Sequence, residues 1–355
     1  MPSFEKLLAT LFIFFITCAA SATDISGAGS SAAQPLYVKW AQAYARRAGT
    51  TVNYQPVGSS GGIKQIKERA IDFGASDVAM STDDLKKEKL ICFPSAISGV
   101  VPVVNIAGIK GGDLRLSGEL LADIFSRKIT RWNDPALAAL NPRLRLPNQA
   151  ITLLVRKDGS GTTYNFTDYL SKMSPAWKQR YGRNFTIAWP ADAIQVKGSD
   201  GVVAALKQTA GAIGYVDYHY MVQDKLAFAK LRNRDGNFVT PAPAEFAAAL
   251  ANSSWPTQAT YEEMLTEKAG ANSWPITMGT FVIVPQTARN PEKAIATLKF
   301  FVWGFMHGDT LVDGADFVRL PELVQGRVFS ELTKVKDGNG RPLEWSISGL
   351  IDLRP

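Results

Sequence analysis

Val100-Val101-Pro102-Val103-Val104-Asn105-Ile106 is a strongly apolar run that predicts a buried β-strand. A second apolar run, Thr280 to Val284, comes much later in the chain. Strand and helix patterns alternate before, between and after these two runs, which indicates an α/β fold. We therefore expect two lobes joined by two hinge crossings. Lobe I would be discontinuous, with residues 23–100 plus 281–355, and lobe II would hold residues 101–280.

Three turns rich in serine and glycine each come before a predicted helix. They are Gly29-Ser30-Ser31, Gly58-Ser59-Ser60-Gly61-Gly62 and Arg156-Lys157-Asp158-Gly159-Ser160-Gly161-Thr162. The start of a helix presents unpaired backbone N–H groups and a partial positive charge, so each turn can hold an anion. Three such turns, one of them with an arginine, predict that a small oxyanion is held from several sides.

Proline, glycine and capping residues bound several predicted helices. Pro35 and Gly49 enclose a helix whose apolar stripe is Leu36, Trp40 and Tyr44. Further helices are predicted from about Gly62 to Ala70, from Gly161 to Met173, from a start within Lys197 to Gly201, and from Asn290-Pro291-Glu292 to near Gly308. Thr260-Tyr261-Glu262-Glu263 has the pattern of a capping box.

The first residues predict export from the cytoplasm. Leu7 to Ala20 is an apolar run too short to span a membrane comfortably, and Ala20-Ser21-Ala22 offers a small-residue cleavage site. Residues 1–22 are therefore expected to form a signal peptide. Its removal leaves Cys92 as the only cysteine, which excludes an internal disulfide. Cys92 lies in an apolar stretch and is interpreted as a buried filler.

Composition limits the partners of the chain. Its 355 residues, 46% of them hydrophobic, are enough for a large core and for about two domains. The net charge is +7, and acidic residues are interspersed among the basic ones, so no long basic block is present. No basic stripe with interleaved aromatic residues is present, so nucleic-acid binding is not expected.

Enzymatic readings find little support in the residues. Gly58 to Gly62 matches the G-x-S-x-G pattern, so a secreted phosphatase or serine hydrolase using Ser59 or Ser60 is an alternative. A catalytic triad also needs a histidine, and the chain has only His219 and His307, neither with an acidic partner evident nearby. No P-loop lysine or metal-ligand cluster stands out, so no catalytic residue, metal or cofactor is predicted.

Two aspartates carry more specific interpretations. Asp77 follows the strand-like stretch 72–76, where it could cap a helix or accept a hydrogen bond from a ligand. Asp158, two residues after Arg156, is expected to hold the guanidinium group of that arginine in place.

The motifs together resemble the periplasmic phosphate-binding proteins (PstS) of bacterial phosphate ABC transporters. The resemblance covers essentially the whole chain after residue 22, and its motifs are 25–31 (ISGAGSS), 57–62 (VGSSGG), 72–77 (DFGASD), 156–162 (RKDGSGT), 211–216 (GAIGYV) and 274–277 (WPIT). It implies a two-lobed type II flytrap fold that closes on one inorganic phosphate. It also implies a monomeric, non-enzymatic periplasmic protein that delivers phosphate to ABC permease subunits at the inner membrane.

The resemblance further implies a ligand set. The donors would be Ser31, Ala32, Ser59, Arg156, Ser160, Gly161 and Thr162, and the single acceptor would be Asp77. An ionised aspartate only accepts hydrogen bonds, and phosphate at neutral pH keeps a proton to donate, whereas sulfate has none. Asp77 therefore argues against the alternative of a sulfate or molybdate receptor. The family usually has threonine-phenylalanine where this chain has Ser31-Ala32, which keeps the hydroxyl and N–H donors but loses the ring.

Overall fold

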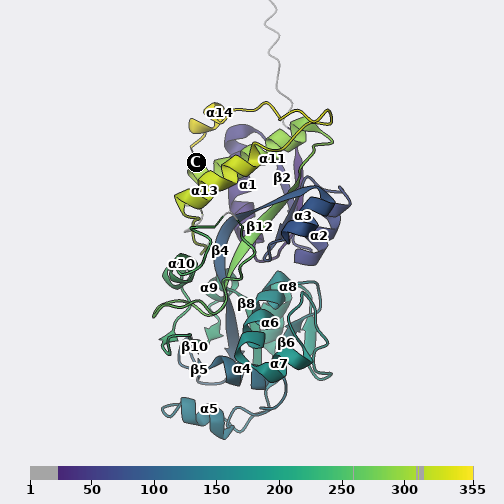
Figure 1. Cartoon of the computed structure of the whole chain (residues 1–355). Helices are drawn as coiled ribbons and strands as arrows, with labels where there is room; N and C mark the ends of the chain where they lie inside the picture. The colour runs from purple at the N-terminus through teal and green to yellow at the C-terminus, as the bar shows by residue number, and fades with distance from the viewer. Residues whose placement is uncertain (1–22, 259, 309–310, 312–315, 355) are drawn as a thin grey trace, which may run out of the picture.

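A computed structural model describes residues 23–258, 260–308, 311 and 316–354. The predicted signal peptide therefore lies outside the described residues. A curled sheet runs through the molecule from one end to the other (Figure 1). Its strands are, in spatial order, β2 (Val52–Gln55), β1 (Ile25–Gly29), β3 (Phe73–Ser76), β12 (Thr277–Pro285), β4 (Leu90–Asn105), β8 (Ala212–Asp217), β6 (Thr152–Arg156) and β7 (Ile194–Val196), and β9 (Ala227–Phe228) pairs with β4 off this path.

Strand β4 joins the two ends of the sheet. Its residues from Leu90 to Gly99, except Ser95, pair with β12, and its last six, from Val100 to Asn105, pair with β8. Nearly all of its 16 residues are buried, as expected for a strand covered on both faces. Both apolar runs singled out in the sequence are therefore strands, although each strand begins earlier than the run that predicted it.

The register between β4 and β12 contains a bulge. Thr280 pairs with Ala96 and Phe281 pairs with Pro94, so Ser95 has no partner in the ladder. Proline cannot donate to a ladder and is tolerated at such irregularities. A bulge turns the side chains on either side of it, and here it lies beside Thr280.

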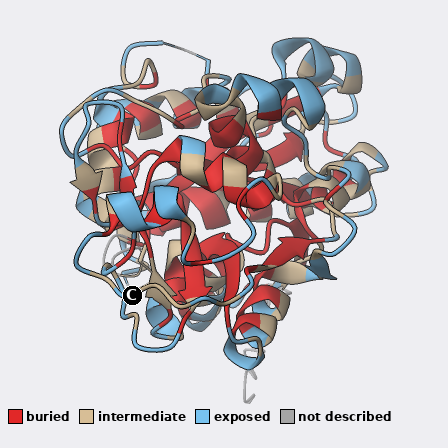
Figure 2. Cartoon of the chain, turned by 90° about the horizontal axis from the view of Figure 1, so that it is seen from below, coloured by how far each residue is buried: buried red, intermediate tan, exposed pale blue. Residues whose placement is uncertain are grey.

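One group of helices packs against the end of the sheet that holds β1 to β3 (Figure 1). These helices are α1 (Gln34–Ala48), α2 (Ser59–Lys67), α3 (Thr82–Glu88), α11 (Pro291–His307), α13 (Glu322–Leu332) and α14 (Ser348–Ile351). Tyr37 and Trp40 of α1 pack edge-on against Phe301 and Phe300 of α11, respectively, and bury a large aromatic core. Figure 2 shows buried residues gathered inside and exposed ones along the outer helices and loops.

A second group of elements surrounds the other end. It comprises α4 (Gly118–Phe125), α5 (Pro135–Leu140), α6 (Gly161–Met173), α7 (Pro175–Arg180), α8 (Gly198–Gln208), α9 (Tyr218–Gln223), α10 (Pro243–Ala251) and a small sheet of β11 (Phe238–Val239), β10 (Lys230–Arg232) and β5 (Arg115–Leu116). Its core includes the stacked rings of Phe166 and Tyr215, whose centroids are 4.2 Å apart. Among the described residues, no helix is long and apolar enough to cross a membrane.

Most predicted helix boundaries are confirmed. Helix α1 buries Leu36, Trp40 and Tyr44 and ends at Gly49, whose φ of 71° is the left-handed conformation that glycine adopts readily. Helix α6 has the predicted bounds, and α11 begins after Asn290 and ends before Gly308. Helix α2 spans Ser59–Lys67, so it begins and ends earlier than the predicted range of Gly62 to Ala70, and the glycine pair at 61–62 lies inside its first turn.

The predicted capping box at residues 260–263 is wrong, because no helix begins there. The carboxylate of Glu262 instead accepts hydrogen bonds from the backbone N–H and the hydroxyl of Thr82 at the start of α3. Glu263 similarly accepts from the backbone N–H of Ser254, at 2.6 Å. Both glutamates therefore accept hydrogen bonds from backbone N–H groups, as in a capping box, but from Thr82 and Ser254 rather than from a helix start at 260–263.

The segment around Trp255 and Glu262 links the two ends of the molecule. Arg327 of α13 donates to the carbonyl oxygens of Trp255, Pro256 and Gln258, at 2.7 to 2.9 Å. This segment lies within the range expected for lobe II, yet its hydrogen bonds go to α3 and α13 in the range expected for lobe I.

The last residues of the described chain fold back on α11. His307 contacts the carbonyl oxygen of Leu350 at 2.6 Å through its Nε2, and Trp303 donates to that of Leu353. Leu350 is buried against the same helix. The tail thus covers the C-terminal end of α11.

Candidate functional site

The three serine- and glycine-rich turns meet at one place between the two groups of helices. The backbone N–H of Gly58 donates to the carbonyl of Gly29 at 2.8 Å, and that of Ser60 donates to the carbonyl of Gly159 at 3.0 Å. A Cβ added to Gly161 would lie 2.4 Å from Ser59 Oγ and 2.7 Å from Asp77 Oδ2. Only glycine fits at this contact, where the start of α6 touches the second turn.

All eight residues of the predicted ligand set belong to this cluster, which we call the cradle. They are Ser31, Ala32, Ser59, Asp77, Arg156, Ser160, Gly161 and Thr162, and every one is buried. Burial strengthens hydrogen bonds to a charged group because water does not compete for them.

Arg156 is the cation of the cradle and is only 2% exposed. Its Nε donates to Asp158 Oδ1 at 2.7 Å and its Nη2 to Asp158 Oδ2, so the predicted role of Asp158 is confirmed. Burial by itself would raise the pKa of Asp158, but the hydrogen bonds and charge of Arg156 bring that pKa below its usual range. The bidentate pair fixes the guanidinium plane and leaves Nη1 facing Ser199 Oγ at 3.5 Å.

At the helix starts, some N–H and hydroxyl groups already have hydrogen-bond partners within the protein, whereas one hydroxyl has none among the described residues. The backbone N–H of Ala32 donates to Ser30 Oγ at 3.0 Å, and that of Ser160 donates to the carbonyl of Phe185 at 3.0 Å. Ser160 Oγ caps α6 by accepting from the N–H of Thr163. Thr162 Oγ1 is buried without a hydrogen-bond partner among the described residues. A buried hydroxyl is normally paired, so an orphan at this position points to a ligand.

Asp77 has no direct ion pair in the described structure, although it is 2% exposed. Its interpretation as a helix cap is wrong, because the cap of α3 is Ser81. The carboxylate accepts from the hydroxyls of Ser30 and Thr280 instead. Burial raises the pKa of Asp77 to about 6, and these hydrogen bonds together with the charge of Arg156 limit the rise.

Four polar residues of the site lie outside the predicted ligand set, although Ser30 belongs to a predicted anion-holding turn. Ser30, Ser199, Thr280 and Asn165 are each 1% exposed. Ser199 Oγ lies 3.1 Å from Ser31 Oγ and comes from the start of α8, and Asn165 donates to the carbonyl oxygen of Asp77. The N-terminal position of Ser199 on a predicted helix was a usable signal. Thr280 lies inside a strand, where no feature of the sequence indicated a site residue.

The histidines do not complete a serine triad in the described structure. No acid-bearing loop near His219 in the sequence indicated a triad partner; in the fold, Nδ1 of His219 lies 3.2 Å from Asp316 Oδ2, 97 positions away in the chain. Its Nε2, however, contacts Gln223 rather than a serine. No group of three or more potential metal ligands is found among the described residues.

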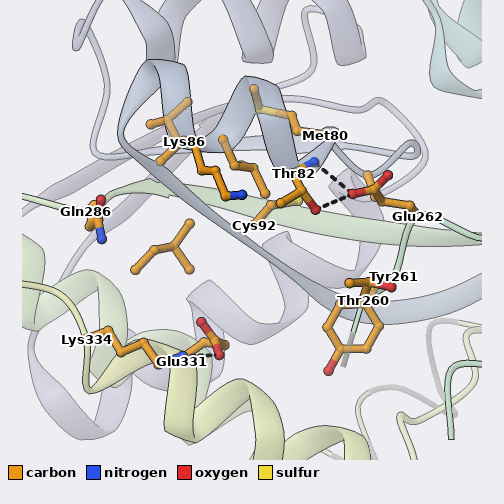
Figure 3. Close-up of a pocket in the computed structure, with 14 residues that line it drawn as sticks. Met80, Thr82, Lys86, Cys92, Thr260, Tyr261, Glu262, Gln286, Glu331 and Lys334 are labelled. Atoms are coloured by element: carbon orange, nitrogen blue, oxygen red, sulfur yellow. Dashed lines mark hydrogen bonds and ion pairs between the residues drawn. The ribbon is translucent and has the colours of Figure 1, made fainter. Parts of the chain in front are cut away.

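Cys92 is half-buried and lines a separate hollow of about 350 Å³ beside α3 and α13 (Figure 3). Burial raises the pKa of its thiol to about 12, which disfavours the reactive thiolate. The hollow shares no lining residue with the cradle. The interpretation of Cys92 as an unreactive filler therefore agrees with its surroundings, although the Cys92 side chain is less buried than expected.

Residues 17–303 match a family model described as a PBP superfamily domain. Among solved structures, a human phosphate-binding apolipoprotein is similar at TM-score 0.69 and 23% identity, with 90% of this chain and all of that one covered. A periplasmic phosphate-binding protein (PfluDING) bound with phosphate is similar at TM-score 0.69 and 22% identity, covering 87% and 93%. The fold and the cradle between its two halves define a protein of the PBP superfamily.

Curated relatives narrow this assignment. A phosphate-binding protein PstS from Pasteurella multocida is 44% identical over 97% of this chain and 99% of its own length. A PstS from Haemophilus influenzae is also 44% identical, over 88% and 93%. The chain belongs to the PstS family.

Proposed function

We propose that this protein captures inorganic phosphate in the cradle and delivers it to ABC permease subunits. The names of the relatives support phosphate as the ligand. The observation that carries the proposal is the pairing of a buried, clamped arginine with a buried carboxylate that has no cation of its own. Arg156 supplies charge-assisted bonds, and Asp77 supplies an acceptor that only a protonated oxyanion can satisfy.

The proposed ligand set is the one predicted from sequence. Ser31, Ser59, Ser160 and Thr162 would donate from hydroxyls, Arg156 from its guanidinium, and Ala32 and Gly161 from backbone N–H groups, with Asp77 as acceptor. The unpartnered hydroxyl of Thr162 supports this set. The N–H of Ala32 would have to leave Ser30 Oγ or be shared with the ligand.

We propose that the protein works as a two-lobed trap, with residues 23–100 plus 281–355 as lobe I and 101–280 as lobe II. Strands β4 and β12 would carry the hinge, and ligand contacts from both lobes would favour closure. We further propose that it acts as a periplasmic monomer, released from its signal peptide at residues 1–22, and that it binds phosphate without turnover or cofactor.

Calorimetric titration of the chain without residues 1–22 tests this function. We expect tight binding of one phosphate per chain that excess sulfate does not displace. Absence of phosphate binding would reject the ligand while leaving the fold intact. A parallel assay with a chromogenic phosphate ester separates binding from hydrolysis, since turnover abolished by Ser59→Ala or Ser60→Ala would favour the enzyme.

A further inference from the structure

Ser30, which is outside the predicted ligand set, donates directly to the acceptor of the cradle. Its Oγ is 2.6 Å from Asp77 Oδ1 and 2.7 Å from Oδ2. Both residues are almost fully buried. The single hydroxyl hydrogen is therefore shared between the two carboxylate oxygens, out of contact with water.

The direction of this hydrogen bond is fixed by the backbone. Ser30 Oγ accepts from the N–H groups of Ala32 at 3.0 Å and Ala33 at 3.2 Å, in the turn before α1. A hydroxyl oxygen has two acceptor positions and one hydrogen to donate. As long as both N–H groups point at Ser30 Oγ, the hydroxyl of Ser30 donates to Asp77 and cannot accept a proton from it.

Thr280 supplies a second hydroxyl from the opposite side. Its Oγ1 donates to Asp77 Oδ1 at 3.1 Å, and the residue is 1% exposed. It lies at the bulge between β12 and β4. Oδ1 thus receives the hydroxyls of Ser30 and Thr280, whereas Oδ2 shares Ser30 and lies on the side of Gly161 and Ser59, where the N-terminus of α6 enters the cradle.

The charged and titratable groups around Asp77 come from both lobes. Arg156 on the far side of the cradle favours the ionised carboxylate. The charge of Asp77 disfavours the ionised form of Asp217 at the end of β8. Tyr37, Tyr54 and Tyr220 also feel the charge of Asp77, and burial raises the pKa of each well above neutrality, so they stay uncharged.

We propose that Ser30 and Thr280 are positioning residues that keep Asp77 ionised and turn its Oδ2 toward the oxyanion, so that the pair sets the discrimination between phosphate and sulfate. This inference rests on the proposed phosphate function. It goes further by assigning selectivity to two hydroxyls that are not themselves proposed as phosphate ligands.

The chemical reason is the difference between the two forms of the carboxyl group. An ionised Asp77 rejects sulfate because two acceptors then face each other. A protonated Asp77 can donate to sulfate, so the discrimination disappears. Removing a donor to the ionised form favours protonation, and the pH at which selectivity is lost therefore rises.

The first experiment follows the Asp77 carboxyl by carbon NMR in the ligand-free protein, with Asp77→Asn identifying its signal. Wild type, Ser30→Ala, Thr280→Val and Thr280→Ser are titrated from about pH 5 to about pH 8. We expect the midpoint to move upward in Ser30→Ala and Thr280→Val and to return toward wild type in Thr280→Ser, which restores the hydroxyl. Unmoved midpoints in both hydroxyl-deleting variants overturn the proposal.

The matched control is Ser273→Ala. Ser273 is also fully buried, and its hydroxyl donates to the carbonyl of Ala269 at 2.6 Å, outside the cradle. It should leave the Asp77 midpoint unchanged. Because Ser30 also caps the turn before α1, its alanine variant can lose stability, and Thr280→Val then carries the test by itself.

The second experiment measures phosphate and sulfate affinity by calorimetry over the same pH range. At about pH 6.5 we expect the phosphate-to-sulfate affinity ratio to fall about tenfold in Ser30→Ala and Thr280→Val. A shifted midpoint with an unchanged ratio overturns the selectivity role. If the midpoint shifts in the variants but the wild-type protein binds no phosphate, the result supports the positioning of Asp77 and rejects the proposed function instead.

Discussion

Asp77, which is buried, and Asp158, which is half-buried, are two aspartates of one site with opposite electrostatic surroundings. Asp158 accepts from Nε and Nη2 of the Arg156 guanidinium, and its pKa lies below the usual range. Asp77 has only hydroxyl donors in direct contact, and its pKa rises to about 6. Burial disfavours the charge of both carboxylates, and the difference in pKa arises because the guanidinium adjoins Asp158, whereas the more deeply buried Asp77 has no cation in direct contact.

The most severe change to this arrangement is Arg156→Ala. It removes the cation of the cradle and leaves Asp158 without its partner, so we expect phosphate binding to weaken by about 2–5 kcal/mol. Calorimetry against the exposed control Arg131→Ala checks the effect, since Arg131 donates only to Asn148. Wild-type affinity in Arg156→Ala would show that the anion is held elsewhere.

Asp77→Asn converts the acceptor into a group that can also donate. We expect the binding preference for phosphate over sulfate to fall by about 1–3 kcal/mol at neutral pH, because the amide N–H can donate to a sulfate oxygen. Competition calorimetry measures the ratio. Asp72→Asn is the control, since Asp72 accepts from Ser26 near the opposite end of β3, outside the cradle. Unchanged selectivity in Asp77→Asn would mean that another group accepts the hydrogen bond from the protonated phosphate oxygen.

Asp217 extends the comparison to a buried carboxyl at the proposed hinge. It accepts from Ser98 Oγ at 2.5 Å and from the N–H of His219, and burial raises its pKa to about 8. The folded state therefore holds a proton that the unfolded state releases near pH 4, so stability falls as the pH rises from about 4 to about 8.

Asp217→Asn should remove this loss, because the amide is neutral at every pH. We expect the variant to exceed wild type in thermal stability by about 1–3 kcal/mol at about pH 8 and to match it near pH 5. Calorimetric unfolding at both pH values gives the answer. A constant difference at the two pH values would rule out titration of Asp217 as the cause.

Thr162→Val makes the smallest expected change. Since Thr162 Oγ1 has no partner in the described structure, its loss should alter unfolding free energy by no more than about 0.5 kcal/mol. Phosphate affinity should fall by about 0.5–1.5 kcal/mol, the usual worth of one hydrogen bond. Equal affinity in variant and wild type would remove this hydroxyl from the proposed ligand set.

The helix starts of the cradle were predictable because their signals are local. Proline at the first turn, glycine at a C-terminus and serine before a helix act through neighbouring residues, and α1, α6 and α11 have close to the predicted bounds. The clamp between Arg156 and Asp158 spans only two positions and was predicted for the same reason. The capping box at 260–263 failed because its acids reach partners far away in the chain.

By itself the sequence determined the α/β pattern, the two long apolar strands, the three serine- and glycine-rich turns before helices and the Arg156–Asp158 pair, all of which depend on residue type and short spacing. Only the tertiary structure decided that Ser30 and Thr280 meet at Asp77 and that Ser199 joins Ser31. Thr280 and Asp77 are 203 positions apart and touch only because β12 lies between β3 and β4. The charge state of a buried carboxyl depends on every group that surrounds it, and those groups are brought together by folding rather than by sequence distance.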